Sequence, residues 1–211
     1  NKDFSCVNGF CPSFVTVHGA RIRKAEGAAG GHDPLEGVPA PRLATLEEGW
    51  SAIVDGIGGT GVVTVGAVLG MAAHLEDKGC GMIDMAGLAQ KGGSVFTHVR
   101  IARTPDDIHA IRVAAGSANL VLGGDIVVTG TKKVLAAVKH GGTEVIVNTT
   151  EFLPGDFTRN ADFSLPTERL KRAITGAASV EHTRFIDATR LATALLGNSI
   201  GANMFMLGYA Y

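Results

Sequence analysis

The chain has 211 residues, with 19 lysines and arginines against 20 aspartates and glutamates, which gives a formal net charge of −1. This length can bury one hydrophobic core with a small appendage, and the balanced charge excludes the basic surface that nucleic acid or an anionic membrane would need. The 29 glycines are about twice the usual share of about 7% and follow no fixed period, and no apolar run reaches the ~18 residues of a membrane span, so we expect a globular α/β protein.

The first part of the chain differs in composition from the rest. Residues 1–24 contain two alternating segments, 13–17 and 20–23, around a His-Gly pair, which predicts a short hairpin. Residues 25–46 are rich in glycine, alanine and proline and have little to bury, as is typical of a linker. We therefore place one α/β domain at 47–211, behind a cysteine-bearing hairpin segment.

The hairpin segment holds two of the three cysteines. Cys6 and Cys11 are separated by four residues, and Pro12 follows, as proline does in some ferredoxin-type cluster sequences. Such thiolates can ligate an iron–sulfur cluster or zinc, but four ligands are normally needed, and Cys80 belongs to a predicted buried strand. Two unligated thiols remain the alternative. An odd number of cysteines without a secretion signal favours a reducing, cytoplasmic location.

From residue 47 the pattern alternates between apolar strands and helices. Several strands are apolar throughout, which indicates burial on both faces of a mainly parallel sheet. The segment 94–102 is more mixed and could be an antiparallel or edge strand. The predicted fold is a three-layer, Rossmann-like α/β domain. We expect strands at 50–55, 80–85, 94–102, 119–123, 144–148 and 184–187, and helices at 60–76, 131–140, 167–176, 188–196 and from about Ile200.

A glycine-dense turn joins the first strand to an almost entirely apolar helix. It matches Gly-x-Gly-x-x-Gly at Gly56, Gly58 and Gly61, and Asp84 ends the next strand in the manner of a ribose-binding acid. One hypothesis is therefore a Rossmann oxidoreductase domain that binds NAD or FAD. A second is that the turn only allows close packing, since Gly66 and Gly70 lie one helical turn apart.

The turn also stands before a helix amino terminus, where free N–H groups can bind an anion. A second glycine-rich loop should face the same crevice, because it leaves the second strand at its carboxyl end. It contains Lys91, a cation that could contact a phosphate or carboxylate, although a plain surface lysine is equally compatible with the sequence. The predicted ligand contacts are Gly58, Gly59, Thr60, Gly61, Lys91, Gly92 and Gly93.

Three segments together resemble the gamma domain of 2-oxoacid:ferredoxin oxidoreductases, most of all the large fused bacterial indolepyruvate enzymes. These are the glycine turn from Gly56 to Thr64, the stretch from Gly81 to Ala102, and a terminal Asn-x-x-x-Leu-Gly at 203–208. The resemblance covers most of residues 1–208. The chain departs from the family in having Thr60 and Lys91 where glutamine and arginine are frequent.

The resemblance implies a thiamine-diphosphate enzyme that converts a 2-oxoacid, here an arylpyruvate, to an acyl-CoA. Electrons would pass through [4Fe-4S] clusters to ferredoxin, and thiamine would be held with Mg²⁺ by partner domains. Gly124-Asp125-Ile126 lacks the third residue of the family's Gly-Asp-Gly thiamine motif, so we expect no cofactor to be bound by this domain alone.

The same resemblance sets the expected partners and leaves one more alternative open. Because the chain begins without methionine and ends in an apolar stretch, we expect a catalytically inert piece of a longer polypeptide that packs against thiamine domains and forms a homo-oligomer. A purely structural assembly domain without any ligand is the further alternative.

Overall fold

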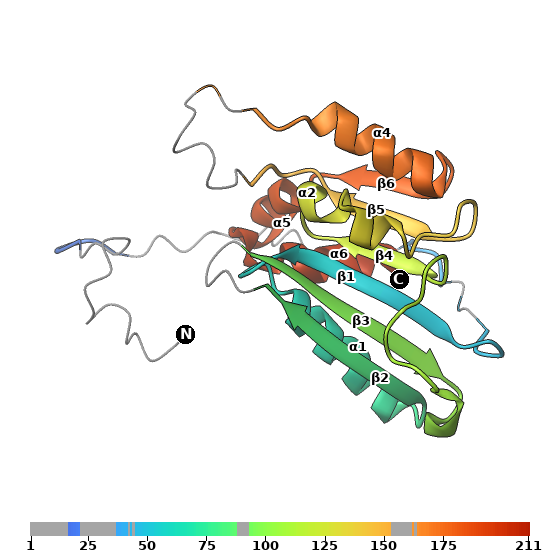
Figure 1. Cartoon of the computed structure of the whole chain (residues 1–211). Helices are drawn as coiled ribbons and strands as arrows, with labels where there is room; N and C mark the ends of the chain where they lie inside the picture. Colours follow the sequence, from blue (N-terminus) through green and yellow to red (C-terminus); the bar gives the residue numbers. More distant parts are fainter. Residues whose placement is uncertain are drawn as a thin grey trace.

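A computed structural model describes residues 17–21, 37–41, 43, 45–87, 93–152, 162 and 164–211 (Figure 1). The predicted cysteine pair, Cys6 and Cys11, lies outside the described residues, as do Lys91 and Gly92 of the second glycine loop. Of the predicted hairpin, the structure describes the turn at His18 and Gly19, in which Gly19 has φ 76°.

The α/β domain begins with the first strand and continues to the end of the chain. None of the described helices is long and apolar enough to cross a membrane. The strands are β1 (Trp50–Ile57), β2 (Gly79–Ala86), β3 (Ser94–Ala102), β4 (Leu120–Gly123), β5 (Glu144–Asn148) and β6 (Thr183–Ile186). The helices are α1 (Val62–Leu75), α2 (Ile126–Thr129), α3 (Lys132–Leu135), α4 (Thr167–Ala178), α5 (Ala188–Leu196) and α6 (Ala202–Ala210), with 3₁₀ turns η2 (Pro105–Asp107) and η4 (Ser199–Gly201).

The six strands form one sheet in the order β2-β3-β1-β4-β5-β6. The pairs β1–β4, β4–β5 and β5–β6 are parallel, as the apolar strand sequences predict. β3 runs antiparallel to both neighbours, β1 and β2, which confirms one of the two possibilities for the mixed 94–102 segment. It is not an edge strand, since β2 occupies that position. Because β3 is reversed, β1 and β2 point the same way.

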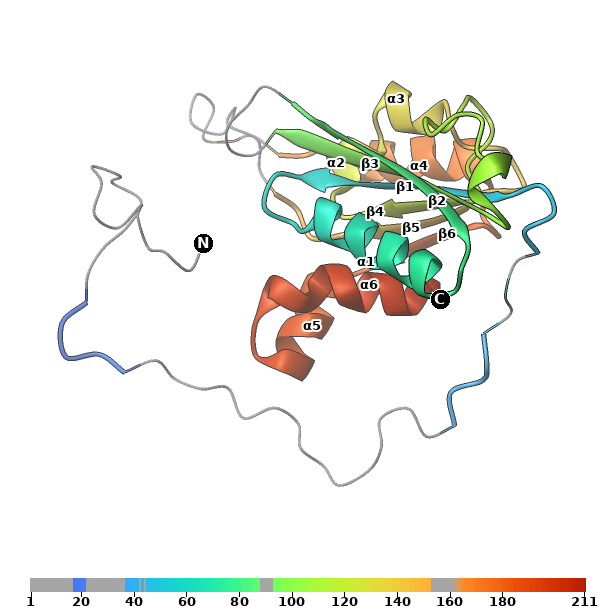
Figure 2. The ribbon, with the colours of Figure 1, turned by 90° about the horizontal axis from the view of Figure 1, so that it is seen from below.

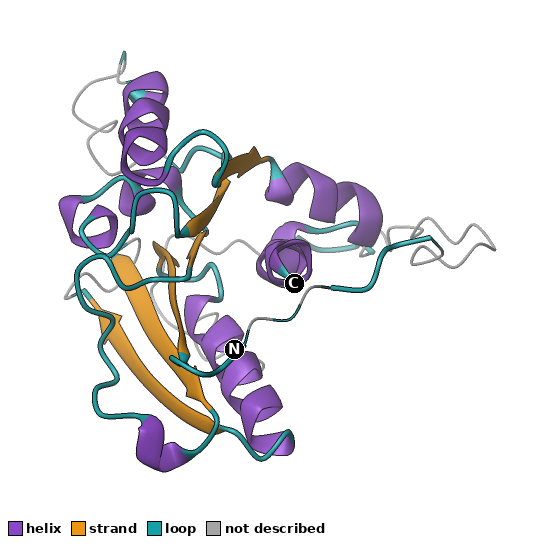
Figure 3. Cartoon of the chain, turned by 90° about the vertical axis from the view of Figure 1, so that its right-hand side faces the viewer, coloured by secondary structure: helices purple, strands orange, loops and turns teal. Residues whose placement is uncertain are grey.

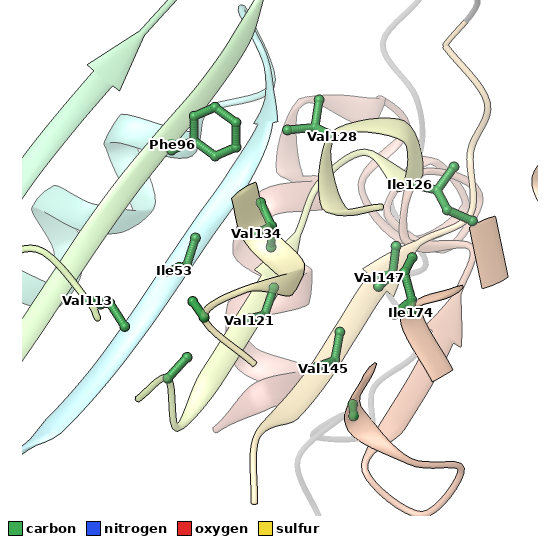
Figure 4. Packing of buried hydrophobic residues seen from close by; sticks show 13 residues of the cluster. Ile53, Phe96, Val113, Val121, Ile126, Val128, Val134, Val145, Val147 and Ile174 are labelled. Atoms are coloured by element: carbon green, nitrogen blue, oxygen red, sulfur yellow. The ribbon is translucent and has the colours of Figure 1, made fainter. Parts of the chain in front are cut away.

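Helices cover both faces of the sheet and give three layers, as predicted (Figure 2). The layer of α1, α5 and α6 buries a cluster that includes Val54, Val65 and Met206. The opposite layer of α2, α3 and α4 buries a second cluster, shown in Figure 4, in which Ile126 and Ile174 pack over the central strands. In Figure 3 the strands lie between these two groups of helices.

The predicted helix at 131–140 is wrong in extent, and α2 was not predicted. The helix ends at Leu135 because the following residues leave the helical path: the carbonyl of Ala137 accepts the Ala118 N–H at 3.0 Å, and Val138 forms a parallel bridge with Ala118. In α2, the sequence Ile-Val-Val-Thr is β-branched throughout and disfavours a helix locally. Burial of Ile126 and Val128 against the sheet overrides that preference.

Candidate functional site

The site lies in a cleft at the carboxyl edge of the sheet, where the chain leaves β1 and β4 toward opposite sides. In open α/β sheets, ligands bind at such a reversal of strand order. The cleft has a volume of about 680 Å³. It is lined by the glycine turn after β1, by residues at the ends of β4 and β5, and by the segment from Ser199 to Met206.

The glycine turn depends on backbone conformations that other residues rarely adopt. Gly59 has φ 97° and Gly61 has φ 79°, both on the positive side that favours glycine. Thr60 closes the turn on itself, because its Oγ1 donates to the Ile57 carbonyl at 2.7 Å. Gly58, Gly59, Thr60 and Gly61 all line the cleft, so the structure brings these four predicted contacts together.

The described end of the second glycine loop lies beside this turn, although the predicted contact Gly93 is not among the residues that line the cleft. The Gly58 N–H donates to the Gly93 carbonyl at 2.8 Å, and the Gly87 N–H donates to the Ser94 carbonyl at 3.0 Å. Gly93 thus adjoins the turn through its backbone. The reversed direction of β3 makes this possible, because it puts the end of β2 and the start of β3 at the edge where β1 ends.

The amino terminus of α1 lies at the cleft, and no acidic side chain in its first turn compensates its partial positive charge. Gly61 is the N-cap, offers no side-chain acceptor, and is followed by a first turn that contains no acid. Helix amino termini carry unpaired N–H groups and partial positive charge. None of the described residues that line the cleft carries a charge. A bound anion would therefore meet a favourable field here, with Thr64 as a nearby hydroxyl.

Asn203 connects the carboxy-terminal helix to the glycine turn. Its Nδ2 donates to the Gly61 carbonyl at 3.3 Å, and its Oδ1 accepts the Met204 N–H at 2.9 Å. A Cβ on Gly61 would come within 2.1 Å of the Asn203 Nδ2, so a side chain at position 61 would clash with Asn203 as it is placed here. Two segments that carry the family resemblance are therefore in direct contact.

Asn148 organises the other wall of the cleft, and sequence reasoning missed it. It ends β5 and is 3% exposed. Its Nδ2 donates to Thr189 Oγ1 at 3.0 Å, and its Oδ1 accepts the Ala188 N–H at 3.1 Å. This one side chain fixes the start of α5 against the end of β5. The available signal was a polar residue directly after the apolar run Val-Ile-Val.

Two buried carboxyl groups lie behind the glycine turn. Asp55 is fully buried in β1, and Asp125 caps α2 by accepting the Val128 N–H at 2.9 Å. Burial raises the pKa of Asp55 well above its ordinary value; the hydrogen bond from Thr129 opposes this, and the charge of Asp125 adds to it. Burial also raises the pKa of Asp125, against hydrogen bonds from the Val128 and Val127 backbone.

The hydrogen bonds of Thr129 agree with a protonated Asp55. The Thr129 hydroxyl oxygen lies 2.8 Å from both the Asp55 Oδ1 and the Asp125 carbonyl oxygen, yet it has only one proton to donate. If Asp55 carries a proton, it can donate to Thr129, which then donates to the carbonyl. Asp125 is 1% exposed, and its Oδ1 caps α2, whereas its Oδ2 has no hydrogen-bond partner among the described residues.

The dinucleotide hypothesis does not fit the sheet. Asp84 lies on β2, which is separated from β1 by the whole of β3, and not on a strand next to the glycine turn. Its carboxylate accepts the Thr97 hydroxyl at 2.6 Å. Nor do the described residues gather three histidine, cysteine or acidic side chains as a metal would require.

Comparison with known proteins identifies the class. A family model described as pyruvate ferredoxin/flavodoxin oxidoreductase matches residues 51–211, and the chain belongs to this family. This family match agrees with the resemblance of the three segments to 2-oxoacid:ferredoxin oxidoreductases.

Individual relatives have more specific names than the family model. The chain is 29% identical over 162 residues to the indolepyruvate oxidoreductase subunit IorB of Methanothermobacter thermautotrophicus, covering 76% of this chain and 77% of the relative. The IorB subunit of Pyrococcus horikoshii is 26% identical over 159 residues, with 75% of each chain covered. The fold matches the pyruvate oxidoreductase subunit PORC of Thermotoga maritima with a TM-score of 0.53 and 17% identity, covering 77% of this chain and 74% of that one.

Proposed function

We propose that this chain is the gamma-type part of an enzyme that oxidatively decarboxylates indolepyruvate or a similar arylpyruvate in the cytoplasm, forming an acyl-CoA, CO₂ and reduced ferredoxin. Support comes from the family match across the whole α/β domain and from the names of the IorB relatives. Thiamine diphosphate, Mg²⁺ and the [4Fe-4S] clusters of such an enzyme would be held mainly by other domains or subunits. Cys6 and Cys11 remain candidates for part of a cluster site.

Within that enzyme, the cleft would help to bind coenzyme A or the 2-oxoacid. The observation that carries this role is the uncapped, acid-free start of α1 at the wall of a 680 Å³ cleft. A phosphate or carboxylate group placed there would accept hydrogen bonds from backbone N–H groups. Lys91, with its glycine neighbours Gly92 and Gly93, would add a cation at the same edge of the sheet.

Isothermal titration calorimetry of this chain with coenzyme A tests the role of the cleft. We expect weak, saturable binding that Gly59→Ala reduces, while Gly176→Ala, a change at an open helical position, leaves it intact. Absence of heat at millimolar ligand would eliminate an independent site. In the assembled enzyme, an unchanged KM for coenzyme A in Gly59→Ala and Lys91→Ala would instead favour the ligand-free assembly domain.

A second role is packing against the thiamine-binding part of the enzyme through α1. The outer face of this helix is apolar and open, with Val63, Val68, Met71 and Leu75 exposed by 48%, 42%, 58% and 76%. Contiguous apolar surface of this kind is typical of an interface with another protein. No acidic or basic residue interrupts the helix between Val62 and His74.

Co-purification with the thiamine-binding subunit tests the packing role. We expect Met71→Lys to reduce the amount of complex, because a charge would be buried in an apolar contact. Val180→Lys is the matched control, since Val180 is 77% exposed beyond the end of α4 in the opposite helical layer. Equal recovery of complex with both variants would refute α1 as the contact.

A further inference from the structure

A second pocket, which the proposed function does not use, lies on the opposite face of the sheet. It has a volume of about 480 Å³. Figure 2 shows this face, where α3 and the long β3–β4 connection lie on the side of the sheet away from α1. Small side chains leave the space open. The lining residues are His98, Arg112, Val113, Ala114, Ala115, Lys133, Ala136 and Ala137.

His98 forms the buried floor of this pocket. It lies in the middle of β3, is only 5% exposed, and accepts the Val113 backbone N–H on its Nδ1 at 3.1 Å. A nitrogen that accepts a hydrogen bond carries no proton, so in the neutral ring the proton must sit on Nε2. Nε2 has no hydrogen-bond partner among the described residues, which leaves an N–H donor in the wall of the pocket.

Two cations border the same pocket without a counter-charge. Arg112 belongs to the β3–β4 connection, and Lys133 to α3. The Lys133 ammonium lies 4.1 Å from the centre of the Phe96 ring, which holds its charge over a buried aromatic face. No acidic residue lines the pocket, and neither cation forms an ion pair within the described part of the chain.

The pKa of His98 reflects the same excess of positive charge around the pocket. Burial lowers the pKa of His98, and the charges of Arg112 and Lys133 lower it further. Both cations are therefore close enough to act on the imidazole. An anion between the two cations would offset their positive charge and could accept a hydrogen bond from the free Nε2–H of the neutral His98 ring.

We propose that His98, Arg112 and Lys133 form an oxyanion-binding site for a phosphate or carboxylate group, separate from the cleft at the glycine turn. One neutral donor from a rigid central strand and two cations from separate elements surround one space. Guanidinium and ammonium groups are the usual partners of such oxyanions, and their hydrogen bonds to them are stronger than neutral ones. The site differs from the cleft, which offers backbone dipoles but no charged side chain among its described lining residues.

Nuclear magnetic resonance of the histidine ring nitrogens tests the site, with inorganic phosphate and acetate as probes at constant ionic strength. We expect a saturable shift of the His98 Nε2 signal. Arg112→Gln and Lys133→Gln should each weaken binding by about five-fold or more, because each removes one charge-assisted contact. Both cations are exposed, so these variants should fold normally.

Lys132→Gln is the matched control. It removes the same charge from the neighbouring position of α3 and does not line the pocket. Tighter binding of phosphate would assign the site to a phosphate-bearing ligand, and tighter binding of acetate to a carboxylate. The proposal is overturned if neither probe saturates, or if Lys132→Gln weakens binding as much as Lys133→Gln does. None of these outcomes depends on coenzyme A or on the activity of the assembled enzyme.

Discussion

Replacing Gly61 by alanine tests whether the carboxy-terminal segment and the glycine turn form one unit. Two independent features oppose a side chain at this position. The backbone has φ 79°, and a Cβ would lie 2.1 Å from Nδ2 and 3.0 Å from Cγ of Asn203. Once Asn203 is shortened to alanine, the nearest remaining atom is its Cβ, at 3.7 Å, which is an ordinary contact. The clash therefore depends on Asn203, whereas the backbone strain does not.

The expected free energies follow from this separation. Backbone strain costs about 1–2 kcal/mol for an L-residue in the left-handed region. Displacing the Asn203 amide loses a hydrogen bond of about 1 kcal/mol and forces a rotamer change of about 1 kcal/mol. Gly61→Ala alone should therefore destabilise by about 3–4 kcal/mol, and Asn203→Ala by about 1 kcal/mol. The double variant avoids the clash and should lose only about 2–3 kcal/mol, so it falls about 2 kcal/mol short of the sum.

Urea denaturation of the four proteins measures these free energies of unfolding by linear extrapolation. Gly59→Ala is the control for backbone strain alone, because Gly59 has φ 97° and a Cβ at that position would meet nothing within 4 Å. We expect it to cost about 1–2 kcal/mol, with no coupling to Asn203→Ala. Strict additivity of Gly61→Ala and Asn203→Ala would refute the contact between turn and helix.

Three further predictions concern the body of the domain. Since burial raises the pKa of Asp55, the folded protein keeps a proton on this carboxyl group at pH values where the unfolded chain releases it. The contribution of the protonated Asp55 to stability is complete below the ordinary aspartate pKa, and it is lost as the pH rises through the folded-state pKa. Wild type should therefore lose stability relative to Asp55→Asn over that range, by at most about 1.4 kcal/mol per pH unit, and parallel pH profiles in urea titrations would contradict a protonated Asp55. Gly66→Ala should destabilise the protein by about 1–3 kcal/mol, because its Cβ would meet Thr97 Cγ2 at 2.6 Å. Gly176→Ala is the control, since its Cβ would meet open space, and it should stabilise the protein by about 0.5–1 kcal/mol. A similar loss of thermal stability in both variants would show that α1 does not pack closely on β3. Asn148→Ala should lower stability by about 2–4 kcal/mol, since it removes the buried bonds to Ala188 and Thr189, and a loss below that of Asn203→Ala would show that the network is not structural.

Strongly patterned elements could be predicted from the sequence to the residue. The bounds of β5 and α5 agree with the expected segments at 144–148 and 188–196. In each of them the local apolar pattern and the tertiary environment favour the same structure. The region from Ile126 to Val138 differs, because its conformation depends on contacts distant in sequence, such as the bridge between Ala118 and Val138. A local pattern cannot report such a contact.

The site residues show the same difference between local sequence patterns and contacts distant in sequence. Glycines 58, 59 and 61 were identifiable because only a sharp strand-to-helix turn needs so many, and their neighbour Gly93 followed from strand direction. The contact between Asn203 and Gly61 spans 142 positions and has no local signature. The basic pocket is similar, since His98, Arg112 and Lys133 come from a strand, a loop and a short helix. Each of these residues alone is an ordinary surface or core residue.

The position of β3 explains why the glycine turn does not act as a dinucleotide fingerprint. In a dinucleotide fold the second strand lies next to the first, which brings its terminal acid within reach of the ribose. Here β3 separates β1 from β2 and pairs with both over their full length. Because β3 runs antiparallel to β1, its start lies beside the first turn, where the Gly58 N–H donates to the Gly93 carbonyl. The cleft beside the turn is bordered by Gly124 after β4, by Asn148 at the end of β5 and by the start of α6, so it is on this side that the structure offers space for a ligand of the turn.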